Sequence, residues 1–385
     1  MSRPMRTAVL VAIVFLVLLT SVGFLDLHDG WIHFASKPLT LVAVGDSIGY
    51  NVPIVRLSGL KGLIGSADIF IFNLEGVLNT LTYPPLKCEG FPRFQSILTS
   101  DASFAKYMKL APLTIANMAN NHILDCGAEG IRRTKQVLLS NNILSLGAGL
   151  DQRAACEPLI LNIRDEWIAF VSYNFAISEL VSASADRAGA ATLAGCRHSY
   201  QQFRSEGVDL IVASIHYGSW SSQVTPEQVR IVDQLFNSGI DLVLGHSPHM
   251  PQAILAREGK LVFFSLGNFI FRPDYRMPTL AYTSIVPRIT YFENRIDVIL
   301  HPILIDEYGI PRSDSSSQTI ERITKASTGF NTYLVVQDNV GYLSITRGST
   351  DISHTAETIQ PLQNKALSLH IRSTWNEVKG SLRPD

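Results

Sequence analysis

Short apolar runs that end in glycine or polar residues recur along the chain. Runs of this length are typical of buried β-strands that are followed by loops. The pattern predicts strands at residues 39–45, 67–76, 113–122, 143–149, 167–174, 208–218, 240–250 and 260–269. Some of the segments between these runs have the pattern of helices instead.

Two intervening segments read as amphipathic helices. Residues 127–142 place their apolar side chains on one side. Residues 225–239 begin with Thr225 as a predicted N-cap and Pro226 at the first helical position, and Gly239 ends them. Strand, polar loop and helix in repeated succession predict a layered α/β domain.

Nearly every unusual polar residue stands just beyond the carboxyl end of a predicted strand. In open α/β sheets, ligands bind in the crevice outside these strand ends. We therefore expect residues that are far apart in the sequence to meet on one rim. They are Asp46, Glu75, Asn121, His122, His216, His246, His249 and Asn268.

The C-terminal part of the chain has the pattern of antiparallel strands. A turn near Glu293 and Asn294 separates two of them, and residues 331–347 have the pattern of a final hairpin. The polar composition of residues 313–318 predicts a loop. The tail that follows the hairpin carries no recognisable chemistry.

The N-terminus has the pattern of a membrane anchor. Arg3 and Arg6 precede an uncharged apolar segment at residues 8–25, whose length falls between a signal-peptide core of about 7–15 residues and a bilayer span of about 20. Because Ser21-Val22-Gly23 is a poor cleavage site, we expect an uncleaved anchor with its arginines in the cytoplasm. A buried core helix is the alternative. The predicted organisation is a signal anchor at residues 1–28, a main domain at 38–310, and a β-hairpin with a tail at 311–385.

Composition narrows the class of protein. The chain has 385 residues and a formal net charge of -1, which argues against a nucleic-acid binder because such proteins usually carry a basic excess. Its four cysteines lack the CxxC spacing of a zinc knuckle. Outside the cytoplasm they can form disulfides in three pairings, but four buried thiols are also ordinary, and the sequence leaves both interpretations open.

The polar residues at the strand ends form a plausible set of metal ligands. Carboxylates, an amide oxygen and imidazoles, without a thiolate, suit Mn, Fe or Zn. The candidate ligands are Asp46, Glu75, Asn121, His216, His246 and His249. Two metals about 3.5–4 Å apart are the usual means of splitting phosphate esters. The neighbouring His122 is a candidate to protonate a leaving oxygen, and Asp125 to brace the loop or that imidazole.

Each of these residues also has a structural explanation on its own. Asp46 after a glycine is often a helix cap, Glu75 a surface carboxylate, and His216 a core histidine with satisfied hydrogen bonds. The two histidines around a proline in GHSPH, and the NNH run followed by Asp125, are harder to explain in this way. The ordered recurrence at five strand ends favours a functional site.

Several motifs resemble those of the CapA family, the poly-γ-glutamate (capsule) synthesis proteins with a metallophosphatase-like fold. They follow the family's order over residues 39–310: GDSIGYN, FNLEGVLNT, ANNHILDCGAEGIRRT, LGAG, HYG, SGIDLVLGHSPHMPQ and SLGNFIF. The resemblance implies a layered, calcineurin-like αββα sandwich. The family is typically membrane-anchored with its domain outside, which agrees with the predicted anchor.

The resemblance also implies roles for single residues. Asp46 matches the first metallophosphatase motif, Glu75 the bridging carboxylate, Asn121 and His122 the Asn-His pair, His216 the lone metal histidine, and His246 and His249 the closing Gly-His-x-His. Three departures stand out. Ile48 occupies the place of a histidine ligand, the bridging residue is glutamate rather than aspartate, and GHSPH has one extra residue. The resemblance thus implies one or two divalent transition-metal ions.

Together these features predict a membrane-anchored, extracytoplasmic protein of poly-γ-glutamate or capsular polymer synthesis or export. We expect a metal-dependent hydrolase of a phosphoester or a polymer amide bond. The alternatives are a non-enzymatic partner subunit of an assembly complex and a plain secreted binding module. Expected partners are the cytoplasmic membrane, an anionic polymer such as poly-γ-glutamate and capsule synthase subunits, and no nucleic acid. The expected location is the cell membrane, crossed once.

Overall fold

The structure is a computed structural model. It describes residues 25–28, 31–34, 38–79, 87–89, 96–176, 178–272, 276–347 and 370–371. The chain divides into two compact units, Met1–Leu39 and Thr40–Asp385. In the first unit, β1 (Leu25–His28) and β2 (Trp31–Phe34) pair antiparallel. The predicted membrane segment at residues 8–25 lies outside the described residues except for its last residue, and the last four residues of the anchor predicted at 1–28 form β1.

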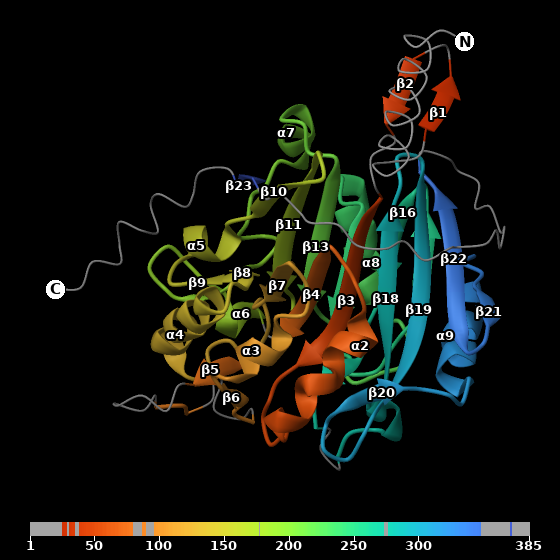
Figure 1. The fold of residues 1–385 in the computed structure, drawn as a ribbon. Coiled ribbons are helices and arrows are strands. Elements are labelled where there is room, and N and C mark those ends of the chain that lie inside the picture. The colour runs from red at the N-terminus through yellow and green to blue at the C-terminus, as the bar shows by residue number, and fades with distance from the viewer. Residues whose placement is uncertain are drawn as a thin grey trace, which may run out of the picture. The chain divides into compact units, whose positions relative to one another are not determined.

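None of the helices in the described part of the chain is long and apolar enough to cross a membrane. The second unit is a mixed α/β structure built on two large sheets (Figure 1). The mixed α/β fold predicted from the sequence is therefore confirmed.

Sheet 1 has a parallel centre with antiparallel strands beside it. Its order is β15 (Ile254–Arg257), β16 (Lys260–Phe263), β14 (Leu242–His246), β13 (Leu210–His216), β11 (Glu166–Asn174), β10 (Leu159–Ile163) and β23 (His370–Ile371). Strands β11, β13, β14 and β16 run parallel. Because neighbouring parallel strands all end on the same side, their carboxyl ends form one edge of the sheet.

Sheet 2 joins a parallel half to an antiparallel half. Its order is β21 (Val335–Gln337), β22 (Val340–Thr346), β19 (Arg295–Ile305), β18 (Thr283–Tyr291), β3 (Leu39–Ser47), β4 (Ile69–Leu74), β7 (Leu113–Asn117) and β8 (Leu144–Leu146), with β17 (Asn268–Ile270) beside β3 and β20 (Pro311–Ser313) beside β19. The predicted turn near Glu293 and Asn294 and the final hairpin are confirmed as β18–β19 and β21–β22.

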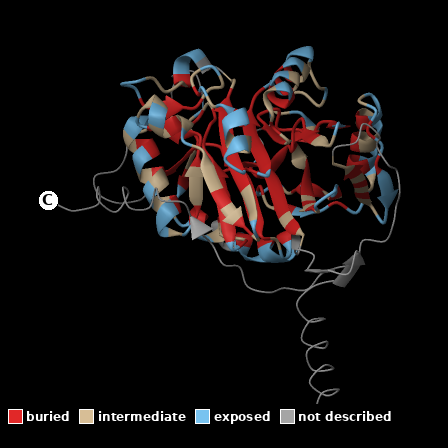
Figure 2. Ribbon diagram, turned by 90° about the horizontal axis from the view of Figure 1, so that it is seen from above, coloured by how far each residue is buried: buried red, intermediate tan, exposed pale blue. Residues whose placement is uncertain are grey.

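The two sheets pack face to face, and helices cover their outer faces. Along β4, Phe70, Phe72 and Leu74 belong to the core that includes residues of the helices over sheet 2, whereas Asn73 points the other way and contacts His216 of sheet 1. This alternation is the period of two expected of a strand. Figure 2 shows the buried strands at the centre and the exposed residues on the surrounding helices and loops.

The helices on the two outer faces come from different parts of the chain. Those packed on sheet 2 are η1 (Ile54–Gly59), α2 (Leu60–Ile64), α3 (Phe104–Met108) and α4 (Gly127–Ser140). Those packed on sheet 1 are α7 (Tyr200–Ser205) and α8 (Pro226–Ser238), and α9 (Gln318–Thr328) contacts β15, β19 and β22. The other short elements are β5 (Val77–Asn79), β6 (Thr99–Asp101), β9 (Ala148–Gly149), α5 (Gln152–Cys156), α6 (Ser178–Val181), β12 (Gly189–Ala190) and η2 (Thr279–Tyr282).

The ends of α8 follow directly from the sequence. The Thr225 hydroxyl accepts a hydrogen bond from the Gln228 backbone N–H, and the Gln228 side chain accepts one from the Thr225 backbone N–H, which completes a capping box. Pro226 fills the first helical position, where its missing N–H costs no hydrogen bond. Gly239 ends the helix at φ 111°, a conformation that favours glycine. The predicted helix is confirmed.

Both pairs of cysteines form disulfides, which settles an alternative that the sequence left open. Cys88 bonds to Cys126, 38 positions further on, and Cys156 bonds to Cys196, 40 positions further on. Each bond closes a long loop, so each is expected to stabilise the fold by restricting the unfolded chain.

Candidate metal centre

Strand pairing aligns the polar residues in one row within each sheet. The row of sheet 2 contains Asn268, Asp46, Asn73 and Asn117, which are register partners across β17, β3, β4 and β7. The row of sheet 1 contains Asn174, His216 and His246, across β11, β13 and β14. Apart from Asn268, which begins β17, the residues of both rows lie at the carboxyl ends of parallel strands, and the rows face one another between the sheets. Four residues of the rim expected from the sequence stand in these rows, namely Asp46, His216, His246 and Asn268. The other four follow the ends of β4, β7 and β14: Glu75, Asn121, His122 and His249.

A β-bulge in β3 turns Asp46 toward the other sheet. Val42 and Val44 pack in the core on the outer face, and strict alternation would send Asp46 to that face as well. The register shifts between Val44 and Asp46, so that Asp46 pairs with Asn73 on the inner face. Such a shift re-aims a side chain. A side chain at Gly45 would clash, because a Cβ there would lie 1.8 Å from the Gly267 carbonyl oxygen.

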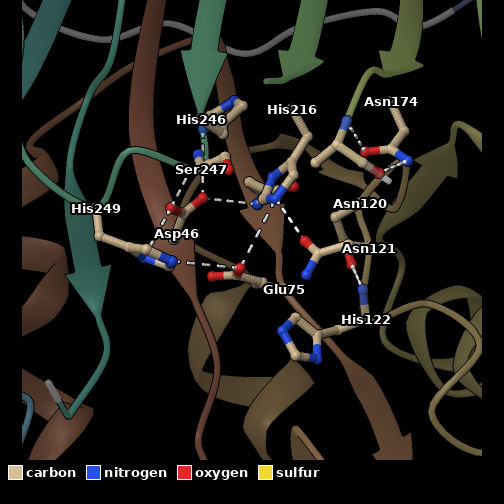
Figure 3. A network of polar contacts seen from close by, with 12 residues as sticks. Asp46, Glu75, Asn120, Asn121, His122, Asn174, His216, His246, Ser247 and His249 are labelled. Carbon is tan, nitrogen blue, oxygen red and sulfur yellow. Dashed lines mark hydrogen bonds and ion pairs between the residues drawn. The ribbon is translucent and has the colours of Figure 1, made fainter. Parts of the chain in front are cut away.

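Asp46, Glu75 and His249 form the centre of the site. One ligand atom of each lies within 4.8 Å of the others. His249 Nδ1 is 3.3 Å from Asp46 Oδ2, and His249 Nε2 is 3.7 Å from Glu75 Oε1. Figure 3 shows the imidazole of His249 reaching toward both carboxylates. Three groups that are 29 to 203 positions apart in the sequence are thus brought together.

Further side chains with candidate metal-ligand atoms surround this centre. His216 Nε2 lies 2.8 Å from Asn121 Oδ1 and 3.7 Å from Glu75 Oε1. Glu75 Oε1 therefore stands between His216 and His249, which is the position required of a bridging carboxylate (Figure 3). His246 lies beside Asp46, with Nδ1 3.8 Å from Asp46 Oδ1. The structure brings together all six residues that the sequence predicts as metal ligands.

Hydrogen bonds fix the tautomer of His249. The Asn268 Nδ2 group donates to the Ala281 carbonyl oxygen at 3.1 Å, so its Oδ1 is left to accept. His249 Nδ1 is 2.8 Å from that oxygen and must be the donor. The lone pair of His249 therefore sits on Nε2, the nitrogen directed at Glu75. Such a partner behind the ring is how proteins orient a histidine that binds a metal.

The loop that carries His249 is held in a strained conformation. Ser247 has φ 95° and His249 has φ 59°, both in the left-handed region that residues with a side chain seldom adopt. Each such residue costs on the order of 1–3 kcal/mol and persists only where its surroundings require it. Here the loop directs the Ser247 N–H to Asp46 Oδ2 at 3.2 Å and places the His249 imidazole beside the same carboxylate.

The electrostatics of the centre favour a bound cation. Burial raises the pKa of Glu75 well above its ordinary value, and the charges of Asp46 and Asp125 raise it further. Within the described residues, the ion pairs of Asp46 and Glu75 are with histidines. Glu75 Oε2 and His246 Nδ1 are buried without a hydrogen-bond partner in the part of the chain that is described. Buried charges are stable only when they are paired or bind a metal.

The histidines are in the form that binds a metal. Burial is the main cause that lowers the pKa of His216, of His246 and of His249, so each is neutral near pH 7. Neutral imidazole, carboxylate and amide oxygen together suit a divalent transition-metal ion. The residues present therefore fit such an ion, and the two unpartnered buried atoms are further candidate ligand atoms.

His122 and Asp125 form a pair beside the centre. His122 Nδ1 lies 2.9 Å from Asp125 Oδ2, which also accepts the Leu98 backbone N–H at 2.7 Å. Asp125 can only accept when ionised, so His122 donates from Nδ1 and keeps Nε2 for another partner. His122 remains 8% exposed, in contrast to the fully buried Asp125. The pair is built as the sequence predicts, with the aspartate orienting the imidazole.

A buried polar network behind the centre was not predicted as part of the site. Asn73 Nδ2 donates to Asp46 Oδ1 at 2.7 Å, and Asn73 Oδ1 accepts from Asn117 Nδ2 at 2.9 Å. The Ser172 hydroxyl of sheet 1 donates to Asn117 Oδ1, which links the two sheets. Each of these residues is a polar residue inside an apolar strand, and that is the signal by which the sequence could have shown them.

The place of the missing histidine is apolar. Ile48 is 1% exposed and packs in the core over sheet 2. Its backbone N–H donates to the Ile270 carbonyl oxygen at 2.7 Å. The side chain of residue 48 therefore offers no ligand atom, and the candidate ligands near Asp46 are Glu75, His246 and His249.

Acid is expected to destabilise the metal-free protein through His246. Burial lowers its pKa from 6.5 to about 4. Below pH 6.5 this histidine takes up a proton in the unfolded chain but stays neutral in the folded protein. The free energy of unfolding should therefore be highest above pH 6.5 and fall by about 3 kcal/mol as the pH decreases toward 4. Urea unfolding at a series of pH values measures this. His246→Gln should show a shallower loss than the wild type over this range, and equal slopes would contradict the assignment.

Comparison with models of known protein families shows the family of this chain. The family model for the bacterial capsule synthesis protein PGA_cap matches residues 27–273, more than half of the chain. The chain belongs to the PGA_cap family. This match covers all the residues of the metal centre, from Asp46 to Asn268.

Curated relatives of this PGA_cap protein carry related names. The capsule biosynthesis protein CapA of Bacillus anthracis is 25% identical over 62% of this chain and 61% of its own length. The probable polyglutamine synthesis accessory protein Rv0574c of Mycobacterium tuberculosis is 27% identical over 55% of this chain and 62% of its own. The matched part thus spans about three fifths of each relative.

Solved structures give weaker likenesses. The NAD nucleotidase NadN of Haemophilus influenzae has 12% identity and a TM-score of 0.37, covering 72% of this chain and 49% of that one. Vps29 of Chaetomium thermophilum has 8% identity and a TM-score of 0.35, covering 83% and 100%. At TM-scores this low, neither likeness carries weight for the fold or the chemistry of this PGA_cap protein.

Proposed function

We propose that this protein is a metal-dependent hydrolase of a phosphoester or a polymer amide bond that serves capsular polymer synthesis or export. The observation that carries the proposal is the meeting of Asp46, Glu75 and His249 within 4.8 Å at the carboxyl ends of parallel strands. Two facing sheets with helices outside and ligands at this rim also support a metallophosphatase-like αββα sandwich.

The residues divide between two neighbouring positions for an ion. Asp46, Glu75 and His249 would hold one ion, with His246 beside Asp46, and Asn121 and His216 lie where a second ion could share Glu75. A divalent ion such as Mn, Fe or Zn polarises the bond under attack and activates water at neutral pH. With Ile48 apolar, the first position receives no ligand from residue 48.

His122 would act on the substrate directly. Its Nε2 is free of the bond to Asp125, and its ring lies beside Asn121 at the site (Figure 3). A proton held on this nitrogen can be given to the leaving oxygen or nitrogen as the bond breaks. Asp125 keeps the ring in the required tautomer and orientation, because its carboxylate accepts from Nδ1.

The setting we propose is outside the cytoplasmic membrane, with the N-terminal segment as a single-pass anchor. The two disulfides support this setting, because such bonds form and persist in oxidising compartments. The names of the relatives, a capsule biosynthesis protein and a probable polyglutamine synthesis accessory protein, support a capsular polymer or an amino-acid polymer as the substrate, and capsule synthase subunits as partners.

Metal analysis tests the proposal. The full chain should retain about one or two transition-metal ions per molecule, while His249→Ala should lose the ion between the carboxylates. Asp233→Asn is the control, because Asp233 is an exposed carboxylate that pairs with Arg257. Wild-type protein that binds no Mn, Fe or Zn after loading would refute the hydrolase.

Trp220 offers a second readout for the same variants. Its ring lies 6.2 Å from the ring of His249, centroid to centroid, and it is 48% exposed. Transition-metal ions quench a nearby indole, so Mn²⁺ titration of metal-free protein should lower the fluorescence of the wild type. The Trp220→Phe variant should lose this quenching while it still binds the metal, and His249→Ala should lose both.

One observation favours a second function. The apolar Ile48 removes a ligand from the centre, and a centre that binds metal without turning over substrate would suit a non-enzymatic subunit of a polymer assembly complex. Deletion of the gene with complementation by Asp46→Asn separates the two functions. The hydrolase predicts that this variant fails to restore the capsule, and the assembly subunit predicts that it succeeds.

A further inference from the structure

A second cavity lies between the η1–α2 segment and the turn that joins β19 to β20. Its volume is about 480 Å³, which is within the usual size of small-molecule sites. Its charged lining residues are Arg56 and Arg312, and His301 and Ser313 add polar groups. We propose that this cavity binds a small oxyanion, the carboxylate or phosphate group of a ligand.

Arg56 is held in place without an acidic partner in the described part of the chain. Its guanidinium lies over the ring of Tyr308, 4.3 Å from the centroid. Stacking on an aromatic ring orients the group and leaves the N–H donors at its edge without a hydrogen-bond partner among the described residues. These donors are therefore available to an oxyanion in the cavity, for which guanidinium has a matching planar geometry.

Arg312 is fixed by the same turn. Its Nη2 atom donates to Asp306 Oδ2 at 2.7 Å. Asp306 Oδ1 in turn accepts the backbone N–H groups of Tyr308 and Ile310, each at 2.9 Å. One turn thus positions the ring under Arg56 and the carboxylate that holds Arg312. The cavity is arranged in advance, which lowers the cost of binding.

The charge balance favours an anion. Two guanidinium groups are set against one carboxylate, Asp306, which does not line the cavity. His301 is half-buried on β19, and burial and the charge of Arg288 lower its pKa, so it contributes a neutral imidazole. Ser313 adds a hydroxyl group that can donate to an oxyanion.

The cavity is separate from the metal centre, because the two share no lining residue or ligand. The turn between β19 and β20 nevertheless packs near the metal centre. A Cβ on Gly309 would lie 3.0 Å from the Phe271 backbone carbon, and the Phe271 ring lies 5.0 Å from His249. Because the cavity shares no residue with the metal centre, the proposal does not depend on the proposed hydrolase function. It can be tested in protein from which the metal has been removed.

Calorimetric titration of the metal-free full chain with inorganic phosphate and with L-glutamate tests the proposal. We expect saturable binding of one of them to the wild type, and which one binds identifies phosphate or carboxylate as the ligand group. Arg56→Gln and Arg312→Gln should each weaken it by about tenfold or more, because a charged hydrogen bond is lost. Arg230→Gln is the control, since Arg230 is 71% exposed and lies beside Glu227.

Two results would overturn the proposal. One is wild-type protein that binds neither phosphate nor glutamate saturably. The other is Arg230→Gln weakening binding as much as Arg56→Gln, which would show attraction to general surface charge. Because Arg56 is exposed and makes no ion pair with the described residues, its variant should fold normally, and an unchanged melting temperature without ligand verifies this.

Discussion

On the proposed hydrolase mechanism, His122→Ala is expected to slow hydrolysis of a dialkyl phosphodiester, whose leaving oxygen needs a proton, by about 10²–10⁴-fold, the usual loss when a general acid is removed. The reason is that Nδ1 of His122 is bonded to Asp125, so Nε2 is the nitrogen that can carry a proton to the substrate. The metal content should stay at the wild-type level, because the candidate metal ligands are other side chains. Initial rates measured beside elemental analysis separate these two effects.

Asp125→Asn is the matched variant for this prediction. It keeps the shape of the side chain and an oxygen for the Leu98 N–H, but it removes the charge that orients and supports His122. We expect a smaller loss of rate than for His122→Ala, together with a changed dependence of rate on pH. Equal rates for wild type and His122→Ala, with metal present, would show that His122 does not transfer a proton in this reaction.

Removing either disulfide is expected to lower the free energy of unfolding by about 4 kcal/mol, the loop-entropy value for closures of this length. The closures span 38 positions for Cys88–Cys126 and 40 for Cys156–Cys196. A loss of this size is a large part of the stability of a typical domain, which is about 5–15 kcal/mol. Urea unfolding of Cys156→Ser/Cys196→Ser measures it away from the metal centre.

Reduced wild-type protein provides the control for the disulfide prediction. It should lose at least as much stability as the double variant, because both bonds are then open. The m-value should change as well, since an unlinked chain exposes more surface when it unfolds. A Cys156→Ser/Cys196→Ser protein as stable as the oxidised wild type would contradict the pairing.

Most strands and helices of this fold could be predicted from the sequence. The spacing of apolar residues and the residue types at turns and helix ends are properties of short, local segments. The runs at residues 69–74 and 210–216 are strands because they are apolar and short, and α8 is defined by its own caps. Helix α9 was missed in a segment interpreted as a polar loop followed by a hairpin. Its signal, Ile320 and Ile323 three positions apart and both buried, was present.

The candidate site was readable in composition but not in geometry. The ligand types and their places after strands followed from the sequence and from the family resemblance. The direction of the Asp46 side chain could not be predicted from the sequence. It depends on a bulge that places Gly45 against Gly267, more than 200 positions away. The pairing of the cysteines and the tautomer of His249 depend in the same way on distant partners.

The position of the Cys88–Cys126 bond has a practical consequence for anyone who makes this protein. Cys126 directly follows Asp125, and the Glu89 N–H next to Cys88 donates to the Asp125 carbonyl oxygen at 3.1 Å. Protein produced in a reducing host would lose the covalent tie beside the residue that orients His122. Such a preparation could bind metal normally and still be inert. Recombinant material should therefore be made by secretion or oxidative refolding, and its thiols counted before any assay.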